Sequence, residues 1–340
     1  MTIGPGKIRL ALLAAALLVA LATAASAQGG VAVTCSLVPA GPAGPAGDVL
    51  KVVDQANSVT HIYREGDEIV VFNNLDSGPT VCAGGTPTVF DLDRIEYSTA
   101  TGTPFLGYLG DGPLAPGASP ETGAAEIEVS IAESYEPKVL NVAGTAAPER
   151  IEIGQLGPKA IGVNLDAQAD GSAQDADVTM AVPRAGAVTV RAVAKGGNDT
   201  VSALGGPAFT GPVVAERVAM SGGPGDDRLL GGPGRDFLRG DDGNDLLLAG
   251  RGRDNLAIGP GRDIAKGGKG PDEIENHSSV GGIADDLLPD RVFGGAGGDN
   301  IDVAQDLPGD RVDCGSGHDR LAVDPGDRTR ACEDVDVIHR

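Results

Sequence analysis

The chain has 340 residues, among them 53 glycines and 23 prolines but no tryptophan, and only 3% of its residues are aromatic. This composition argues against a wide globular core built on large rings and favours a turn-dense repeat protein over a helical one. The net charge of −22 gives a surface that repels nucleic acid and anionic membranes, so neither is expected as a partner.

The N-terminus has the pattern of a secretory signal peptide over residues 1–27. Lys7 and Arg9 precede an apolar stretch at 10–22, and a run of small residues suited to cleavage ends at Ala27. A membrane anchor is the alternative, but the apolar stretch is shorter than the ~20 residues that a spanning helix needs. We therefore predict a secreted chain without a membrane span, cleaved after Ala27.

Residues 28–47 are predicted to be a flexible linker, and 48–190 an irregular β-rich or solenoid region. Short runs rich in β-branched residues recur there, separated by Gly, Pro and Asp. The expected strands of this region and of the segment after it are Val49–Val53, Glu68–Phe72, Arg94–Tyr97, Ile127–Ile131, Val139–Ala143, Arg150–Ile153, Ile161–Leu165, Val178–Val182, Val188–Arg191, Thr200–Ala203 and Arg217–Met220. An unrelated β-sandwich would also have strands at this spacing. We favour a solenoid, because Lys195–Val201 already approximates the regular repeat that follows.

From Gly222 to Glu275 the sequence repeats every nine residues with the template Gly-Gly-x-Gly-x-Asp-x-U-x, where U is apolar. Glycine tolerates positive φ and so permits a tight turn. The x-U-x segment then makes a short strand whose middle residue points inward. Two units make one turn, so strands eighteen residues apart stack as parallel neighbours. A disordered Gly/Asp-rich tract is the alternative, but such a tract would not hold a nine-residue phase.

This arrangement suits calcium, which takes six to eight oxygen ligands from carboxylates and carbonyls. The Asp in sixth place supplies the carboxylate, and the turn supplies the carbonyls. We predict several ions, four or more, each held between a loop and the loop eighteen residues further on. The expected metal-binding residues are Gly223, Gly225, Asp227, Gly232, Gly234, Asp236, Gly243, Asp245, Gly252, Asp254, Gly261, Asp263, Gly270, Asp272, Asp290, Asp299 and Asp319.

After Glu275 the pattern degrades but keeps its phase, and we interpret Asn276–Phe293 as one further turn. The eighteen-residue period then gives two rows of aspartates: Asp227, Asp245 and Asp263 in one, and Asp236, Asp254, Asp272 and Asp290 in the other. The first row is expected to end at Asn276–Ala284, which has no Asp. Asp310 is expected to bind weakly, because Leu307-Pro308 replaces the template turn. Residues 191–322 are predicted to form the roll, and 323–340 a cap over its last strand edge.

Four cysteines remain after the predicted cleavage, and an even number in a secreted protein suggests disulfides, with three possible pairings. Cys314 and Cys332 are eighteen residues apart, one full turn of the repeat. Stacked positions lie about 5 Å apart, within the Cα–Cα range of a disulfide. We therefore predict that Cys314 and Cys332 pair in the cap, which leaves Cys35 with Cys82. Free buried thiols are the alternative, which an oxidising compartment disfavours.

The units from Gly222 to Glu275, with Gly294–Asp302, resemble hemolysin-type calcium-binding (RTX) repeats. The segment from Cys314 to Glu333 is similar to the tails of secreted calcium-binding repeat proteins of high-GC bacteria. The resemblance implies a parallel β-roll, calcium ligation by the sixth-place aspartates and turn carbonyls, and calcium-triggered folding outside the cell. The fold class predicted is therefore all-β, a parallel β-roll or β-helix solenoid with an irregular N-terminal part and a disulfide-bonded C-terminal cap.

RTX repeats often accompany a protease or lipase, but the chain has neither His-Glu-x-x-His nor Gly-x-Ser-x-Gly. Its four histidines are scattered: His318 lies in a repeat turn, and His277 has no marked partner acid for a Ser/His site. No catalytic residue is assigned. Two functions remain open. One is a secreted calcium-binding protein with a structural or interaction role, whose cell-surface or extracellular partner is unknown. The other is a secreted hydrolase or polysaccharide-acting β-helix enzyme with a site in residues 48–190.

Overall fold

The computed structural model describes residues 33–39, 48–54, 60–65, 68–73, 80–87, 92–99, 128–133, 138–144, 146, 148–164, 178–182, 188–213, 217–276, 288–304 and 309–338. The predicted signal peptide lies outside these residues, as do most of the predicted linker and the histidine at 277. Within the described residues the secondary structure is all-β, and none of it is a helix able to cross a membrane.

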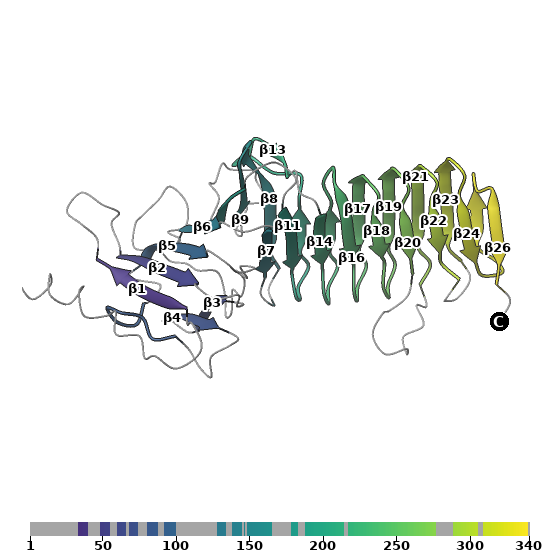
Figure 1. Cartoon of the computed structure of the whole chain (residues 1–340). Helices are drawn as coiled ribbons and strands as arrows, with labels where there is room; N and C mark the ends of the chain where they lie inside the picture. The colour runs from purple at the N-terminus through teal and green to yellow at the C-terminus, as the bar shows by residue number, and fades with distance from the viewer. Residues whose placement is uncertain are drawn as a thin grey trace, which may run out of the picture.

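Two long sheets and one hairpin make up the fold (Figure 1). Sheet 1 contains, in spatial order, β1 (Thr34–Val38), β2 (Asp48–Asp54), β5 (Leu92–Thr99), β6 (Glu128–Glu133), β10 (Val178–Ala181), β9 (Ala160–Asn164), β8 (Arg150–Gly157), β12 (Thr200–Ser202), β15 (Arg228–Leu230), β17 (Leu246–Arg251), β19 (Ile264–Lys269), β21 (Arg291–Ala296), β23 (Arg311–Ser316) and β25 (Arg328–Arg330), with β13 (Gly211–Pro212) paired to β8. Sheet 2 contains β7 (Lys138–Ala143), β11 (Val188–Val193), β14 (Arg217–Ser221), β16 (Arg235–Arg239), β18 (Asn255–Ala257), β20 (Glu273–Glu275), β22 (Asn300–Asp302), β24 (Arg320–Val323) and β26 (Asp334–Val337). The hairpin joins β3 (Thr60–Glu65) to β4 (Glu68–Asn73).

The regular part of the fold is a roll in which the chain alternates between the two sheets. Each coil contributes one short strand to sheet 1 and one to sheet 2, and successive coils pair in parallel. Arg228 pairs with Leu246, and Phe237 with Asn255, so the step is the predicted eighteen residues. The eighth-place side chains point inward and are fully buried, Leu229 and Leu247 among them. Burying a leucine stabilises a fold by ~1.5–3 kcal/mol, so this column of apolar residues is the core.

The step changes once inside the repeat array, and here the prediction was wrong. Ile264 of β19 pairs with Arg291 of β21, and Glu273 of β20 pairs with Asn300 of β22, a step of twenty-seven residues in each sheet. Asn276–Phe293 is therefore not one further turn. The unit at 276–284 has neither glycine in its first places nor Asp in its sixth, and β21 joins sheet 1 and not sheet 2.

The N-terminal part continues sheet 1 edge to edge. β2, β5, β6 and β10 pair in parallel, whereas β1, β9 and β8 introduce antiparallel pairs. This continuity favours the solenoid over the sandwich, and each run expected to be a strand overlaps with one. The strand Thr34–Val38, however, lies where a flexible linker was expected. It is held by pairing with β2 and by the disulfide at Cys35.

Both predicted disulfides are present. The Cα atoms of Cys35 and Cys82 are 4.6 Å apart, and those of Cys314 and Cys332 are 5.1 Å apart. The reason given for the second pair needs correction, because the last step of sheet 1 is seventeen residues: Asp313 pairs with Arg330. Cys314 is thus level with Ala331, not Cys332. Ala331 has φ of 51°, and this turn leads the backbone directly to Cys332.

Candidate metal sites

Sixth-place aspartates line the interior of the roll in two rows, one along each turn between the sheets. Row 1 consists of Asp199, Asp227, Asp245, Asp263, Asp290 and Asp310, and row 2 of Asp236, Asp254, Asp272, Asp299 and Asp319. Every one of these residues is at most 3% exposed. Two expectations were wrong: Asp290 belongs to row 1, and row 1 does not end at residues 276–284. Asp310, expected to be a weak position, occupies row 1 with the same backbone contact as the others.

Glycines of the turn let neighbouring coils approach closely. Gly225 has φ of 143°, and a Cβ built there would collide with the carbonyl oxygen of Gly197 in the previous coil. Only glycine fits such a position. Of the glycines predicted to serve the sites, Gly223, Gly225, Gly243, Gly252, Gly261 and Gly270 have positive φ, whereas Gly232 and Gly234 do not. The template therefore builds turns of two shapes, and row 1 and row 2 are not equivalent at every coil.

One oxygen of each carboxylate is used to join successive coils. The backbone N–H of Asp227 donates to Oδ1 of Asp245 at 2.7 Å, and the N–H of Asp254 donates to Oδ1 of Asp272 at 2.9 Å. The same contact recurs along both rows. At the C-terminal end, Asp327 and Glu333 supply the accepting oxygens for row 1 and row 2 respectively.

The second oxygen has a different environment. Oδ2 is buried and accepts no hydrogen bond from the protein in seven of these residues: Asp199, Asp227, Asp245, Asp254, Asp272, Asp299 and Asp319. A buried ionised carboxylate without a counter-charge costs several kcal/mol. Two aspartates differ, because Oδ2 accepts a hydrogen bond from a protein donor in each of them. Asp236 Oδ2 accepts from the N–H of Gly232 at 2.7 Å, and Asp290 Oδ2 accepts from Nδ2 of Asn276 at 2.8 Å.

Main-chain carbonyl oxygens also lie close to Oδ2 of the row aspartates. A Cβ built on Gly267 would lie 2.5 Å from Oδ2 of Asp272 and 2.8 Å from the carbonyl oxygen of Gly294, so the missing side chain leaves a space lined by both oxygens. Among the described residues no three His, Cys, Asp or Glu side chains gather into a site of their own, so carbonyls are needed to complete one. Carboxylates with carbonyls are the ligand set of calcium, whereas zinc prefers nitrogen and sulfur.

Comparison with protein families agrees with this ligand set. Residues 221–256 match the family described as RTX calcium-binding nonapeptide repeat, in four copies. These residues are RTX repeats. A search of the curated proteins found no match, and neither did a search of the solved structures. The matched segment contains the first aspartates of both rows within the repeat array, Asp227 and Asp236, and the chain thus contains a calcium-binding β-roll.

Burial changes the acidity of several aspartates in the two rows. It raises the pKa of Asp199, Asp245 and Asp254 to about 7 and that of Asp272 to about 6, and the negative charges of neighbouring aspartates add to the effect. The exposed Asp226 behaves in the opposite way, because hydrogen bonds from Asn244 lower its pKa. These four carboxyl groups therefore take up protons at a higher pH than an exposed aspartate does, so protons compete with a cation for their oxygens.

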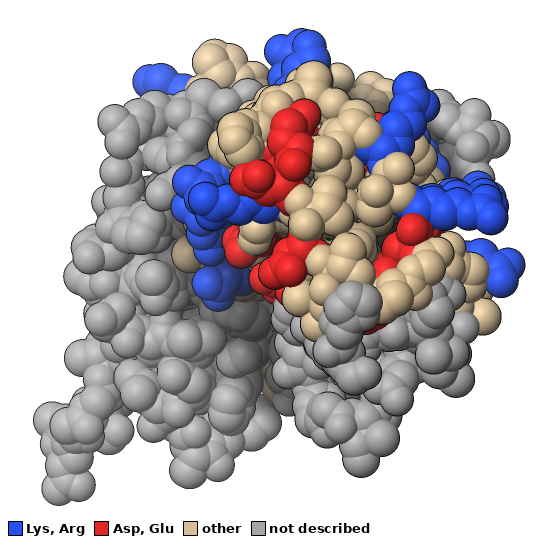
Figure 2. Space-filling view, turned by 90° about the vertical axis from the view of Figure 1, so that its right-hand side faces the viewer, with Lys and Arg blue, Asp and Glu red and all other residues tan. Residues whose placement is uncertain are grey.

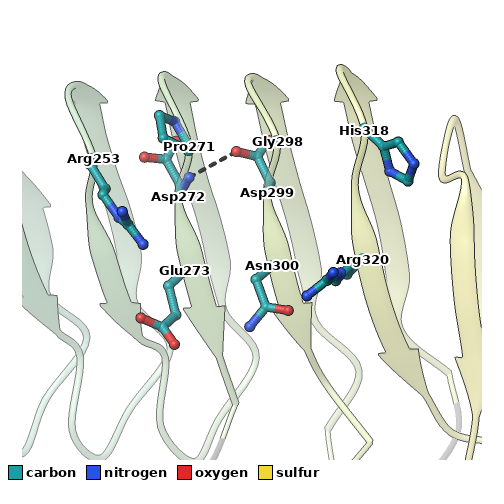
Figure 3. Close-up of a pocket in the computed structure, with 9 residues that line it drawn as sticks. All are labelled: Arg253, Pro271, Asp272, Glu273, Gly298, Asp299, Asn300, His318 and Arg320. Atoms are coloured by element: carbon teal, nitrogen blue, oxygen red, sulfur yellow. Dashed lines mark hydrogen bonds between the residues drawn. The ribbon is translucent and has the colours of Figure 1, made fainter.

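The outer surface over row 2 carries an open polar cavity of about 510 Å³ (Figure 3). Arg253, Glu273, Asn300 and Arg320 line it, so its walls carry both signs of charge. The ring of His318 also borders it; this side chain is 75% exposed and lies 3.9 Å from Asp334. The histidine is thus solvated, as its place in a repeat turn indicated.

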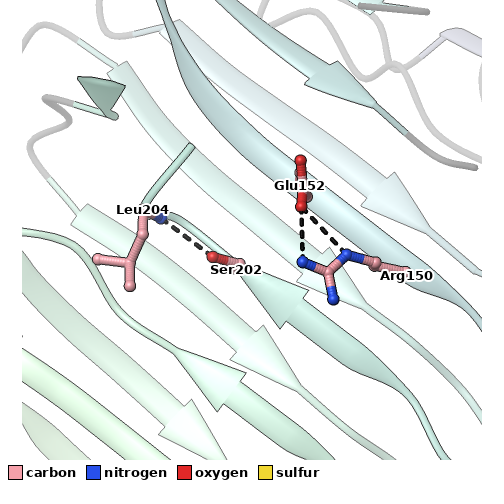
Figure 4. Close-up of polar contacts among 4 residues, drawn as sticks. All are labelled: Arg150, Glu152, Ser202 and Leu204. Atoms are coloured by element: carbon pink, nitrogen blue, oxygen red, sulfur yellow. Dashed lines mark hydrogen bonds and ion pairs between the residues drawn. The ribbon is translucent and has the colours of Figure 1, made fainter. Parts of the chain in front are cut away.

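Residues 48–190 contain one buried acidic side chain in their described part, Glu152 (Figure 4). Its Oε1 accepts hydrogen bonds from Nε and Nη2 of Arg150, at 3.1 and 2.9 Å. The facing backbone at Gly206 is so close that a Cβ there would collide with Oε2. The carboxylate is therefore neutralised by an arginine and covered by the loop after β12, which is a structural role.

Proposed function

We propose that the protein is secreted and that its RTX roll folds on binding several calcium ions outside the cell, where it has a structural or interaction role. The observation that carries the proposal is the set of seven buried Oδ2 atoms without a protein donor. Calcium, when bound, supplies the positive charge that these oxygens lack. The chain's own residues do the rest: the turns bring carbonyls close, and the aspartates join each coil to the one before it.

Electrostatics explains why folding would depend on the ion. Aspartates of successive coils stack one strand spacing apart, about 4.8 Å. Two like charges at this distance repel by about 1 kcal/mol in water and by a few kcal/mol at the lower effective dielectric of a protein surface. Several such pairs rival the ~5–15 kcal/mol that stabilises a whole domain. The ion-free roll is therefore expected to be largely unfolded at pH 8.

The number of ions follows from the same oxygens. An ion between two coils is shared by two carboxylates, so seven oxygens without a donor require four or more ions. Asp236 and Asp290 are not expected to need one at Oδ2, because Gly232 and Asn276 already donate there.

Calcium titration of the full mature protein tests the proposal. Calorimetry should give four or more bound ions, and circular dichroism should show the β signal rising with bound calcium. Magnesium is the matched control, because it demands a smaller octahedral site and keeps its waters. An unchanged β signal after removal of calcium with a chelator would refute calcium-dependent folding.

Secretion is tested separately. Material recovered from the medium of an expressing cell should begin at Gln28, directly after the small-residue run that ends at Ala27. Retention of Met1, or protein found only inside the cell, would contradict this part of the proposal and leave calcium binding untouched.

A further inference from the structure

The turn between β7 and β8 has the contacts of an RTX turn, although its sequence over 144–149 has glycine in the first place only. The N–H of Gly144 donates to the carbonyl of Val193 in the next coil at 2.8 Å. The N–H of Glu149 donates to Oδ1 of Asp199 at 2.7 Å. In the first coil of the repeat array, the first and sixth residues make the same two bonds, so this turn forms one further coil with a glutamate in sixth place.

The strands on both sides of this turn keep the register of the roll. β7 pairs in parallel with β11, and β8 with β12. Ile151 has the eighth place, pairs with Val201 and is 1% exposed, so it extends the buried apolar column of the roll by one residue. Row 1 therefore begins with Glu149, one coil before Asp199, in the region 48–190 that was expected to be irregular.

The carboxylate of Glu149 lies in the same position as that of a row aspartate. A Cβ built on Gly144 would collide with Oε2 of Glu149 and would lie 2.7 Å from the carbonyl oxygen of Ala194, the first residue of the next coil. A Cβ built on Gly222 would likewise collide with Oδ2 of Asp227 and would lie 2.8 Å from the corresponding carbonyl oxygen. In both turns, the glycine in first place thus leaves a space that oxygens of two successive coils border.

The two ends of row 1 differ. The C-terminal end of the roll faces the viewer in Figure 2, with Lys and Arg side chains at its rim and acidic side chains nearer the centre. Row 1 is closed there by Asp327, whose Oδ1 accepts the N–H of Asp310 at 3.1 Å. At the N-terminal end the row starts with Glu149, which is half-buried and therefore within reach of water. A cation bound at this end would be in contact with solvent.

Negative charge accumulates at this end of the row. Asp199 is 2% exposed, and its Oδ2 is buried without a donor from the protein. Burial raises the pKa of Asp199 to about 7, and the negative charges of Asp227 and Glu149 add to the effect, so the carboxylates of Glu149 and Asp199 lie close enough to repel each other. Carboxylate and carbonyl oxygens are the ligands of calcium, which takes six to eight of them and accepts water among them.

We propose that Glu149, Asp199 and the carbonyl of Ala194 hold a calcium ion outside the RTX repeats, and that this ion joins the N-terminal part of the chain to the roll. The proposal rests on the calcium-binding function proposed for the rows. The ion links the coil of β7 and β8 to that of β11 and β12. Because β8 also pairs with β9, and β9 with β10, sheet 1 continues into the N-terminal part through the coil that the ion holds. Water completes the shell of the ion, so the site should bind calcium more weakly than the interior sites and fill last.

Calorimetry of the full mature protein counts the ions. Glu149→Gln keeps the size of the side chain and removes its charge, so it should bind one ion fewer than the parent. Gly144→Ala leaves every charge in place but fills the space with a methyl group, and should lose the same ion; Gly144 does not have positive φ, so alanine fits its backbone. Glu68→Gln is the matched control, because it removes the same charge at an exposed position of β4 and should bind like the parent. Circular dichroism confirms that every variant is folded in calcium.

Hydrogen exchange of backbone amides locates the ion. The N–H of Thr200 donates to the carbonyl of Glu149, and that of Glu149 to Asp199, so both amides lie between the two coils. Raising calcium to ten times the dissociation constant of the last site should slow their exchange about tenfold in the parent. Glu149→Gln should not show this slowing, whereas residues 222–275 should exchange alike in both proteins. If Glu149→Gln binds as many ions as the parent and gains the same protection, the proposal is overturned while calcium binding by the rows stands. A Gly144→Ala variant that keeps all its ions also overturns it, and a parent that binds no calcium refutes both proposals.

Discussion

Asn276 gives the sharpest test of how the rows bind calcium. It occupies the first place of its coil, because its N–H donates to the carbonyl of Asp302 as that of Gly240 donates to Ala257. Gly222 and Gly240 occupy this place in two other coils of row 1, next to Oδ2 of Asp227 and Asp245, whereas Ile258 occupies it in the coil between. The buried amide of Asn276 instead donates to Oδ2 of Asp290 at 2.8 Å. The amide thus occupies the space next to Oδ2 and donates a hydrogen bond to it. In the coils with glycine at this place, we propose that a calcium ion does both.

Replacing this residue with the template glycine, Asn276→Gly, should exchange a hydrogen bond for an ion. A hydrogen bond to a charged group contributes ~1.5–3 kcal/mol, so at the lowest calcium concentration that supports folding the variant should be less stable by about 2 kcal/mol. Each additional bound ion adds about 1.4 kcal/mol of stability for every tenfold rise in calcium. The deficit should therefore disappear within one to two decades of calcium concentration.

Urea unfolding at a series of fixed calcium concentrations measures this slope, and calorimetry measures the number of ions directly. The variant should bind one ion more than the parent. Asn300→Gly is the control, because it makes the same change at an exposed position of β22. If Asn276→Gly loses the same stability at every calcium concentration and binds the same number of ions, then the amide does not stand in for calcium, and the reasoning is refuted.

Three further predictions concern the rows and the cap. Asp245→Asn should lower calcium affinity and stoichiometry in calorimetry, whereas Asp226→Asn, one place from row 1 but exposed, should change them little. Burial raises the pKa of Asp199, Asp245 and Asp254 from 3.8 to about 7, so the ion-free fold gains stability as pH falls from 8 towards 4. Circular dichroism in chelator should show more β structure at pH 5 than at pH 8, while calcium affinity should fall over the same range because protons compete. Cys314→Ser/Cys332→Ser should lower the stability of the last coil by ~3 kcal/mol, seen as earlier proteolysis of the C-terminus; cleavage at the parent rate would contradict it.

The nine-residue phase made much of this fold predictable. A Gly-rich turn followed by Asp and a short apolar strand dictates its own local structure, so the coils from Gly222 to Glu275 have the predicted register. Within these coils the aspartates eighteen residues apart are neighbours as expected, and both disulfides pair as expected. In these coils the sequence pattern and the packing of the apolar residues specify the same strand register, so the sequence alone is sufficient to predict the fold.

The failure after Glu275 has a physical cause. An insert of nine residues keeps the phase of the repeat but moves the chain to the other sheet, because a coil needs eighteen. The nine-residue period alone therefore does not distinguish a nine-residue unit that forms half a coil from a nine-residue loop inserted between two coils. The signal was the composition of the segment from Asn276 to Ala284, which lacks both the Gly-rich turn and the Asp. The donor role of Asn276 depends on which side chains become neighbours, and that follows only from the true register.

The hydrogen bonds along each row all point the same way: a carboxylate reaches back to the coil that precedes it in sequence. This direction holds for the N–H groups of the row aspartates, whereas strand donors such as the N–H of Leu246 bond to the coil before them, here to the carbonyl of Asp227. Past the end of each row no further row aspartate follows, and Asp327 and Glu333 accept the bonds of the Asp310 and Asp319 N–H groups beside the disulfide. Truncation before Asp327 would remove both acceptors from buried donors, at a cost of ~1–3 kcal/mol each. The cap is therefore part of the hydrogen-bond system of the rows as well as a cover for the last strand edge.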